Sequence, residues 1–174
     1  MGQDKALLRL QGETLAERGL RKLREVCPEV AIAGGVPELG RLARVVPDRH
    51  PGCGPLGGIV AALEQTHHEW NLFLPIDVPF LPVLALRALL FNSGGKSLVT
   101  VAQVKGRAHP LCGVYSRNAL PALVGELDAG RRKVMEAIRA VQDYSFVQFE
   151  DEDWFHNLNT PEEFAMAEDL IGWQ

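Results

Sequence analysis

The chain has 174 residues, of which 47% are apolar, and its formal net charge is −4 at pH 7. This length and apolar content predict one domain, residues 1–174, with a full hydrophobic core. The acidic balance argues against general nucleic-acid binding, which usually depends on a basic face, and no apolar run approaches the roughly 20 residues that are needed to cross a bilayer.

Short apolar runs alternate with segments of helical spacing along the chain. The first half predicts, in order, an apolar run at 7–10, a helix over 14–26, strands at 30–33 and 45–46, a glycine- and proline-rich loop at 51–58, a helix over 59–65, a strand at 70–76 and a helix over 81–91. The second half predicts strands at 98–104 and 110–115 around a basic turn, helices over 120–127 and 134–141, a strand at 146–149 and a last helix opened by Thr160.

This alternation of strands and helices predicts an α/β fold, with a mainly parallel sheet and helices on both of its faces. In such a sheet the ligand crevice lies at the carboxyl ends of the strands. Asp48, Asp77 and the pair Gly34 and Gly35 follow predicted strands, so we expect them to converge on one side. A nucleotide-binding domain of this kind normally opens with a strand and a glycine-rich turn, and residues 1–6 contain neither.

The start of the chain and its cysteines indicate in which cellular compartment the protein is expected. Met1 is followed by polar residues rather than by a basic stretch and an apolar segment, so no secretory signal is expected. The three cysteines, Cys27, Cys53 and Cys112, lack metal-type spacing and are predicted to be reduced thiols. We therefore expect a cytoplasmic protein without a nucleic-acid or membrane partner. A small anionic ligand is compatible with the charge, because a few local amides and cations suffice to bind a phosphate.

Asp77 is the candidate metal ligand, because it follows a continuous apolar strand and precedes a proline, Pro79. Mg²⁺ is typically held by one or two carboxylates together with substrate phosphates, and a carboxylate at a strand end suits that role. The alternative is that Asp77 caps the helix that begins near Leu81. Spacing alone leaves both interpretations open.

Asp48 and the loop at 51–58 form a second group of candidates. Asp48 could accept hydrogen bonds from ribose hydroxyls or assist the metal, or it could bond its own backbone in a turn. The loop contains four glycines and two prolines and leads into a helix, so its backbone could approach an anionic ligand closely. It could equally be a tight connection, with Cys53 as a small buried residue rather than a nucleophile.

The remaining candidates are cations and amides. Lys5 could neutralise charge that develops during phosphoryl transfer, although a lone lysine near a terminus is usually solvated. His109, beside Arg107, could contact an anionic substrate. A basic cluster at 131–133 stands at a predicted helix start, where cations are disfavoured. Asn157 and Asn159 share one face if they end a strand, and they could bind a pterin or a phosphate or cap the last helix.

Six segments, taken together and in this order, resemble the molybdenum cofactor guanylyltransferase family, also called molybdopterin-guanine dinucleotide synthases. They are MGQDKALLRLQG at 1–12, PDRHPGCGPLGGI at 47–59, LPIDVPFL at 74–81, HPLCGVY at 109–115, AGRRKV at 129–134 and NLNTPEEF at 157–164. The specific part is the combination of the D-x-P-F/Y and N-x-N-T-P-E motifs. The resemblance covers essentially the whole chain.

The resemblance implies a Rossmann-like nucleotidyltransferase domain that transfers GMP from GTP to the phosphate of molybdenum-bearing molybdopterin, releases pyrophosphate and requires Mg²⁺. It implies GTP and molybdopterin as partners, with molybdoenzyme apoproteins or other proteins of the cofactor pathway as further candidates. The molybdopterin phosphate is expected to attack the α-phosphorus of GTP without a covalent enzyme intermediate.

The resemblance also implies roles for individual residues. Lys5 and Asp77 would be catalytic, with Lys5 on the GTP phosphates and Asp77 as the Mg²⁺ ligand. The nucleotide site would further contain Asp48, Gly54, Pro55, Leu56 and Gly58. The molybdopterin side would contain Arg131, Arg132, Asn157 and Asn159.

The chain departs from the family pattern at two places. The family signature is L-A-G-G-x-S-x-R-M-G-x-D-K, and residues 1–5 match its last five positions. An internal methionine at Met1, a fragment and a truncated paralogue are the open explanations, and we expect in-frame codons before Met1 to encode an apolar strand and an Ala-Gly-Gly-type turn. The second departure is Ala33, Gly34 and Gly35, where some relatives carry a base-contacting asparagine, so the guanine preference follows from the motif set as a whole.

Other functions are compatible with these residues. A molybdopterin cytidylyltransferase or a sugar-phosphate nucleotidyltransferase would share the early motifs, and a trial with GTP, CTP and UTP would separate them. A non-catalytic protein that holds molybdopterin or a target apoenzyme would fit the absent phosphate loop. Release of pyrophosphate would exclude that last class.

Overall fold

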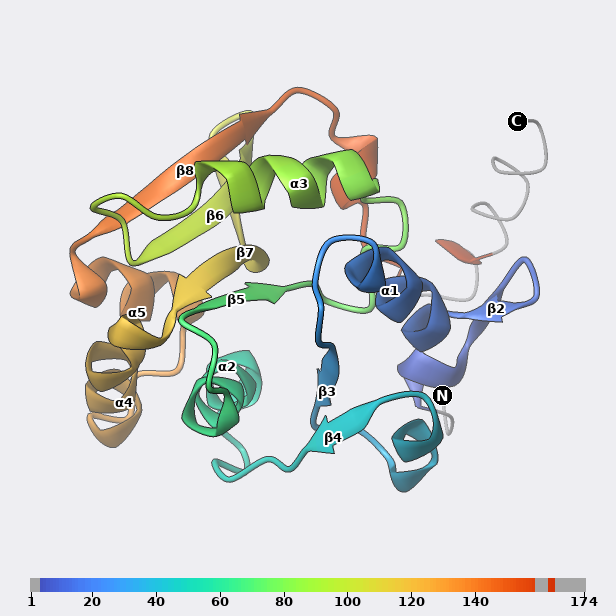
Figure 1. The fold of residues 1–174 in the computed structure, drawn as a ribbon, viewed down its shortest axis with the longest axis horizontal. Coiled ribbons are helices and arrows are strands. Elements are labelled where there is room, and N and C mark those ends of the chain that lie inside the picture. Colours follow the sequence, from blue (N-terminus) through green and yellow to red (C-terminus); the bar gives the residue numbers. More distant parts are fainter. Residues whose placement is uncertain (1–3, 159–162, 165–174) are drawn as a thin grey trace.

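The computed structural model describes residues 4–158 and 163–164, and its helices lie around strands of different lengths (Figure 1). The strands are β1 (Arg9–Leu10), β2 (Glu13–Thr14), β3 (Ala31–Ala33), β4 (Arg44–Val46), β5 (Trp70–Phe73), β6 (Val99–Val104), β7 (Arg107–Ser116) and β8 (Tyr144–Phe149). The α-helices are α1 (Leu15–Arg24), α2 (Gly54–Gln65), α3 (Val83–Asn92), α4 (Leu120–Asp128) and α5 (Val134–Val141). Short 3-10 helices are η1 (Lys5–Leu7), η2 (Pro37–Arg41), η3 (Arg117–Ala119) and η4 (Asp153–Phe155).

The strands form one four-stranded sheet, in the order β5-β7-β6-β8, and two pairs, β1-β2 and β3-β4. β6 runs parallel to β8 and β3 parallel to β4, whereas β7 is antiparallel to both of its neighbours. The turn at Lys105 and Gly106, both with positive φ, explains the antiparallel pairing, because a two-residue connection can join only antiparallel strands. The α/β class is therefore confirmed, and the large sheet is mixed rather than mainly parallel.

Helices cover both faces of the large sheet. On one face, α2, α4 and α5 bury their apolar residues against Val99, Val101 and Tyr115. On the other face, α3 packs against Ala102 and Val114. Neighbouring residues of a strand point to opposite faces, which explains how Val114 and Tyr115 serve two different cores. Each face is thus sealed, and open space for a ligand has to lie at the edge of the sheet.

Three local expectations need correction or lie outside the described part. α2 begins at Gly54 rather than at residue 59, so the second half of the predicted loop is the first turn of a helix, with Pro55 inside that turn. The segment before Leu158 contains η4 and irregular backbone instead of a strand. Asn159 and the predicted helix opened by Thr160 fall outside the described residues. Among the helices that are described, none combines the length and the apolar character that crossing a membrane requires.

Candidate active site

A cavity of about 500 Å³ lies between α1, β3, the start of α2 and the segment that follows β5. Five residues selected from the sequence line it: Lys5, Gly35, Pro55, Gly58 and Asp77. Its floor contains apolar residues of β3 and β5, which form no hydrogen-bonded ladder with each other in the described structure. The cavity is therefore polar at its mouth and apolar toward the sheet.

Lys5 and Asp77, far apart in the sequence, meet at this mouth. The Nζ atom of Lys5 lies 3.7 Å from Oδ2 of Asp77, and the two side chains are 26% and 27% exposed. Asp4 helps to position Lys5, because its Oδ1 atom accepts a hydrogen bond of 2.9 Å from the backbone N–H of Ala6 and so caps η1. The structure thus places the predicted cation beside the predicted metal ligand.

The segment after Asp77 is held by a buried lysine that the sequence analysis did not select. Lys22 of α1 is only 8% exposed, and its Nζ atom donates to the carbonyls of Pro79 and Leu81 at 2.5 and 2.7 Å. Burial lowers the pKa of Lys22 to about 8, although the two carbonyls favour its charged form. The helical spacing gives no sign of this role, because a lysine on an amphipathic helix normally faces solvent.

Asp77 itself is fixed through its backbone. Its carbonyl accepts a hydrogen bond of 2.9 Å from the N–H of Leu158. This bond holds Leu158, the chain neighbour of Asn157, against the segment that follows β5. Pro82 occupies the N-cap position of α3 and has no side-chain cap bond, so Asp77 does not cap that helix. The structure therefore removes the capping alternative and leaves the carboxylate facing Lys5.

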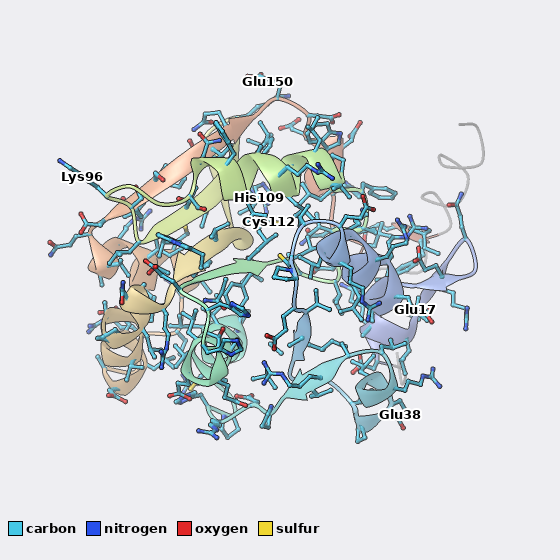
Figure 2. All side chains as sticks on the ribbon, viewed as in Figure 1. Glu17, Glu38, Lys96, His109, Cys112 and Glu150 are labelled. Atoms are coloured by element: carbon cyan, nitrogen blue, oxygen red, sulfur yellow. The ribbon has the colours of Figure 1, made fainter. Side chains whose placement is uncertain are left out.

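Cys112, which is labelled in Figure 2, is a buried residue of β7. Burial raises the pKa of the Cys112 thiol to about 12, and the negative charge of Asp77 adds to the increase. A thiol that is almost fully protonated at neutral pH is a poor nucleophile. Cys112 is therefore a packing residue of the buried core rather than a nucleophile.

The start of α2 forms one wall of the cavity. Gly54 has a φ of +62°, a conformation that side chains rarely adopt, and Gly57 approaches the carbonyl of His50 so closely that a Cβ atom would lie 2.9 Å from it. A Cβ atom on Gly58 would meet that of Ala33 at 3.9 Å, across the cavity. The side chain of Leu56 is fully buried in the core, so any contact of Leu56 with a ligand would have to come from its backbone.

Asp48 lies at a local turn. It is exposed, and its Oδ1 atom accepts a hydrogen bond of 2.8 Å from the backbone N–H of His50. It does not line the cavity as the described residues form it. This placement matches the turn alternative, and the nucleotide role of Asp48 stays a prediction.

The basic pair has protein partners of its own. Arg131 makes two hydrogen bonds with Glu126, at 2.6 and 2.5 Å, and this pairing raises the pKa of Arg131. Arg132 donates to the carbonyl of Gly52 at 2.9 Å, so it braces the loop before α2. In the described structure neither arginine lines the cavity that contains Lys5 and Asp77.

Asn157 is exposed and lines a second cavity, of about 420 Å³. Arg107 and His109 of β7 lie in the same cavity. The ring of His109 packs on Phe155 with centroids 4.6 Å apart, and burial, followed by the charge of Arg107, lowers the pKa of His109. The lining of the second cavity thus combines an amide and basic groups with two glutamates, Glu152 and Glu163. Asn157 is the chain neighbour of Leu158, whose N–H bonds to the carbonyl of Asp77.

Known proteins resemble this chain along most of its length. A model of the MobA-like NTP transferase domain matches residues 1–143. A molybdenum cofactor guanylyltransferase of Cereibacter sphaeroides is 36% identical over 98% of this chain and 89% of its own length. One of Serratia proteamaculans is 32% identical over 99% of this chain and 86% of its own length.

Among solved structures, the molybdopterin-guanine dinucleotide biosynthesis protein A of Archaeoglobus fulgidus has a TM-score of 0.80 against this chain. It is 22% identical, over 99% of this chain and 93% of that one. A 2-C-methyl-D-erythritol 4-phosphate cytidylyltransferase of Thermus thermophilus has a TM-score of 0.71 at 20% identity, over 97% and 94% of the two chains. At these identities the likeness concerns the fold, which is that of nucleotidyltransferases.

Proposed function

The chain belongs to the MobA-like NTP transferase family, and on that premise we propose that it transfers GMP from GTP to the phosphate of molybdenum-bearing molybdopterin, with release of pyrophosphate. The observation that carries the proposal is the meeting of Lys5 and Asp77 at the mouth of the 500 Å³ cavity. The names of the relatives from Cereibacter and Serratia support guanine as the base. Three free cysteines support a cytoplasmic setting for the reaction.

Asp77 fits the metal of such a reaction. Its carboxylate is partly exposed at the cavity mouth, and Mg²⁺ is usually bound by one or two carboxylates that leave room for substrate phosphates. We propose that Asp77 holds Mg²⁺, which, when bound, neutralises charge on the phosphate oxygens. Enzymes of this class generally use a divalent cation, and we propose that the cation is magnesium in this chain.

The side chains then act by position and charge. An oxygen of the molybdopterin phosphate forms the new bond to the α-phosphorus of GTP, and the bond to the pyrophosphate oxygen breaks. Lys5 stabilises the negative charge that moves onto the leaving pyrophosphate, and the N–H groups of the first turn of α2 add to this stabilisation. Lys22 and Leu158 hold the backbone around Asp77 so that its carboxylate stays in place.

We assign the two substrates to two sides of Asp77. The cavity with Lys5, Pro55 and Gly58 would take the nucleotide, and the second cavity, with Asn157 and the basic groups of β7, would take molybdopterin. The backbone bond between Leu158 and Asp77 supports this arrangement, because it joins the two sides at the reacting centre. The assignment of Arg131 and Arg132 to the molybdopterin side stays a prediction.

We also propose that a further strand belongs between β3 and β5 in the active enzyme. Residues of both strands line the 500 Å³ cavity and another of about 280 Å³, so unfilled space separates two strand edges. A strand there, followed by a glycine-rich turn, would supply amide donors for the triphosphate. The test is to read the codons upstream of Met1 and to compare the extended chain with the 174-residue chain. Equal turnover by the two would contradict this proposal.

The function is tested by measuring pyrophosphate release with molybdopterin, Mg²⁺ and each of GTP, CTP and UTP in turn. We expect turnover with GTP that exceeds turnover with CTP or UTP. Faster release with CTP would indicate a cytidylyltransferase. Tight binding of molybdopterin without release of pyrophosphate, in both the extended and the 174-residue chains, would indicate a protein that carries the cofactor without transforming it.

A further inference from the structure

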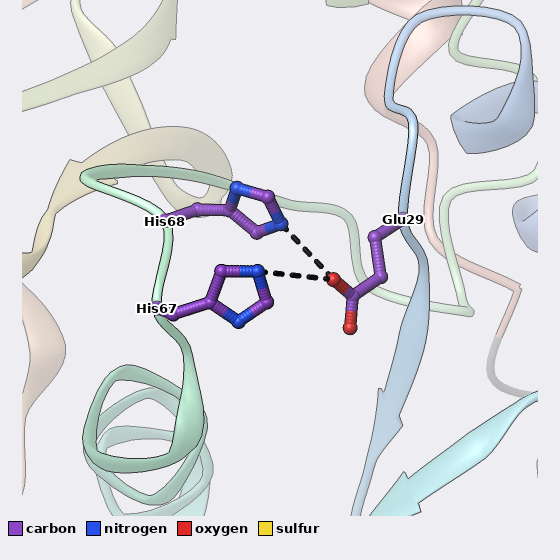
Figure 3. A group of neighbouring side chains, drawn as sticks. All are labelled: Glu29, His67 and His68. Atoms are coloured by element: carbon purple, nitrogen blue, oxygen red, sulfur yellow. Dashed lines mark hydrogen bonds and ion pairs between the residues drawn. The ribbon is translucent and has the colours of Figure 1, made fainter.

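Two histidines and a glutamate, none of which lines the cavity with Lys5 and Asp77, converge in one cluster (Figure 3). Glu29 precedes β3, and His67 and His68 lie in the loop between α2 and β5. The Oε2 atom of Glu29 is 3.0 Å from Nε2 of His68 and 3.8 Å from Nε2 of His67. Each residue offers one ligand atom, and the three atoms all lie within 4.8 Å of one another.

These separations suit a common metal ion. Bonds of about 2.0–2.1 Å from a tetrahedral ion to nitrogen and oxygen place the ligand atoms roughly 3.3–3.4 Å apart. The distance to His68 is already close to this value, and the distance to His67 would need to shorten by a few tenths of an ångström. The side chain of His67 is 77% exposed, so it has room to make that movement.

Arg44, the neighbouring cation, pairs with only one of the two carboxylate oxygens of Glu29. Nη2 of Arg44 lies 3.6 Å from Oε1 of Glu29, whereas the histidines approach Oε2. Arg44 thus pairs with one carboxylate oxygen, and the other oxygen points at both imidazole rings (Figure 3). Two imidazoles with one carboxylate are a ligand set for zinc, copper, nickel or cobalt, whereas Mg²⁺ and Ca²⁺ prefer oxygen ligands alone.

We propose that Glu29, His67 and His68 form a binding site for a first-row transition ion of the zinc type. This site is separate from the magnesium proposed at Asp77, because the histidines precede β5 and Asp77 follows it. Three protein ligands leave a fourth position for water.

The position of the site in the fold indicates what the ion does. Glu29 stands two residues before β3, and His68 stands two residues before β5. In the described structure no ladder joins these two strands, and a cavity lined by both of them also contains Glu29 and His68. A bound ion would fasten the β3 segment to the large sheet at the amino ends of the strands. We therefore expect it to stabilise the protein.

The test uses the chain without a histidine tag and titrates it with ZnCl₂ at neutral pH by calorimetry. We expect one ion per chain and a rise in the unfolding temperature of roughly 5–10 °C when free Zn²⁺ is a hundredfold above its Kd. X-ray absorption should report two imidazole nitrogens on the ion. An excess of MgCl₂ should not displace the bound Zn²⁺, because magnesium prefers oxygen ligands alone and would bind at Asp77. A stoichiometry below one, or a zinc spectrum with sulfur ligands, would overturn the proposal.

Variants locate the site. His67→Ala, His68→Ala and Glu29→Gln should each weaken Zn²⁺ binding by at least about tenfold. His50→Ala is the matched control, because His50 also pairs with a glutamate, Glu64, at 3.4 Å. Cys27→Ser is a second control, since Cys27 lines the cavity that contains Glu29 and His68. If either control weakens binding as much as the three ligand variants do, the ion binds elsewhere and the proposal fails.

Discussion

The half of the molecule built on the four-stranded sheet differs from the half built on β1 to β4 in how its strands are held. β6 shares six residue pairs with each of its neighbours, and apolar residues of four helices seal the two faces. β3 and β4 share three pairs, and β1 and β2 share two. Figure 1 shows these short pairs beside the large sheet, near α1.

The candidate site lies at the border between these halves. Asp77 lies in a turn four residues after β5, which is shorter than the strand predicted at 70–76, whereas Lys5 comes from η1, in the half built on β1 to β4. Ligand-binding segments are often drawn from the less stable parts of a protein, because they have to adjust when a ligand enters. The comparison therefore suggests a fixed carboxylate and an adjustable cation.

The largest effect is expected at Asp77. Asp77→Asn should lower pyrophosphate release by at least about 100-fold, because a neutral amide holds a divalent cation weakly. Its unfolding temperature should stay near that of the parent, since the side chain is partly exposed in a turn. Turnover is measured beside Asp128→Asn, a control at the exposed end of α4. Near-parental turnover of Asp77→Asn would remove Asp77 from the metal site.

The link between the halves is the next target. Lys22 of α1 donates to two carbonyls after Asp77, and Lys22→Met would leave both without this donor. We expect a loss of about 1–3 kcal/mol in the free energy of unfolding, measured with urea, and a parallel fall in turnover. An unchanged stability would mean that the two halves are held together by other contacts.

Lys22 also predicts a pH dependence. Its pKa is about 8 in the folded protein, below the ordinary 10.5, so the unfolded chain binds this proton more tightly. The stability of the parent should therefore rise relative to Lys22→Met as the pH increases from about 8 to about 10.5. The bonds to the two carbonyls can persist after deprotonation, because the neutral amine still has N–H donors. Urea unfolding at several pH values measures this difference. A relative fall across the same window would contradict the buried state of Lys22.

Hydrogen exchange tests the comparison directly. Amides of β6 and β7 should exchange only through global unfolding, whereas those of β3 and β4 should exchange by local opening, at least about tenfold faster. Residue-resolved exchange by NMR gives both rates. Equal protection in the two halves would show a single cooperative unit. If Zn²⁺ binds as proposed, adding it should slow exchange in β3 more than in β6.

The smallest effect is expected at Asn157. Asn157→Ala should weaken molybdopterin binding several-fold and leave GTP binding nearly unchanged, because Asn157 lines the second cavity and not the first. Arg131→Ala is measured beside it, because Arg131 is predicted to belong to the same molybdopterin side but is paired with Glu126 in the structure. Separate titrations of the two ligands give both affinities. A greater loss for GTP than for molybdopterin would reverse the assignment of the two sides.

Much of the fold could be predicted from the sequence. The order of strands and helices, the α/β class and the place of Asp77 in the connection after a strand follow from local periodicity and turn residues, which act over a few neighbours. The motifs at 47–59 and 74–81 were enough to indicate the family. Even so, α2 begins inside the predicted loop, because Gly54 and Pro55 fit a first helical turn as well as a connection.

Only the tertiary structure decided which distant residues meet. Lys5 faces Asp77, Lys22 is buried on the segment after Asp77, and the N–H of Leu158 bonds to the backbone carbonyl of Asp77. The side chain of Leu56 lies in the core, although its motif marks a ligand loop. A sequence pattern predicts the face of a strand or helix on which a residue lies. The residue that it contacts across that face is set by the long-range packing of sheets and helices, and local spacing does not encode this packing.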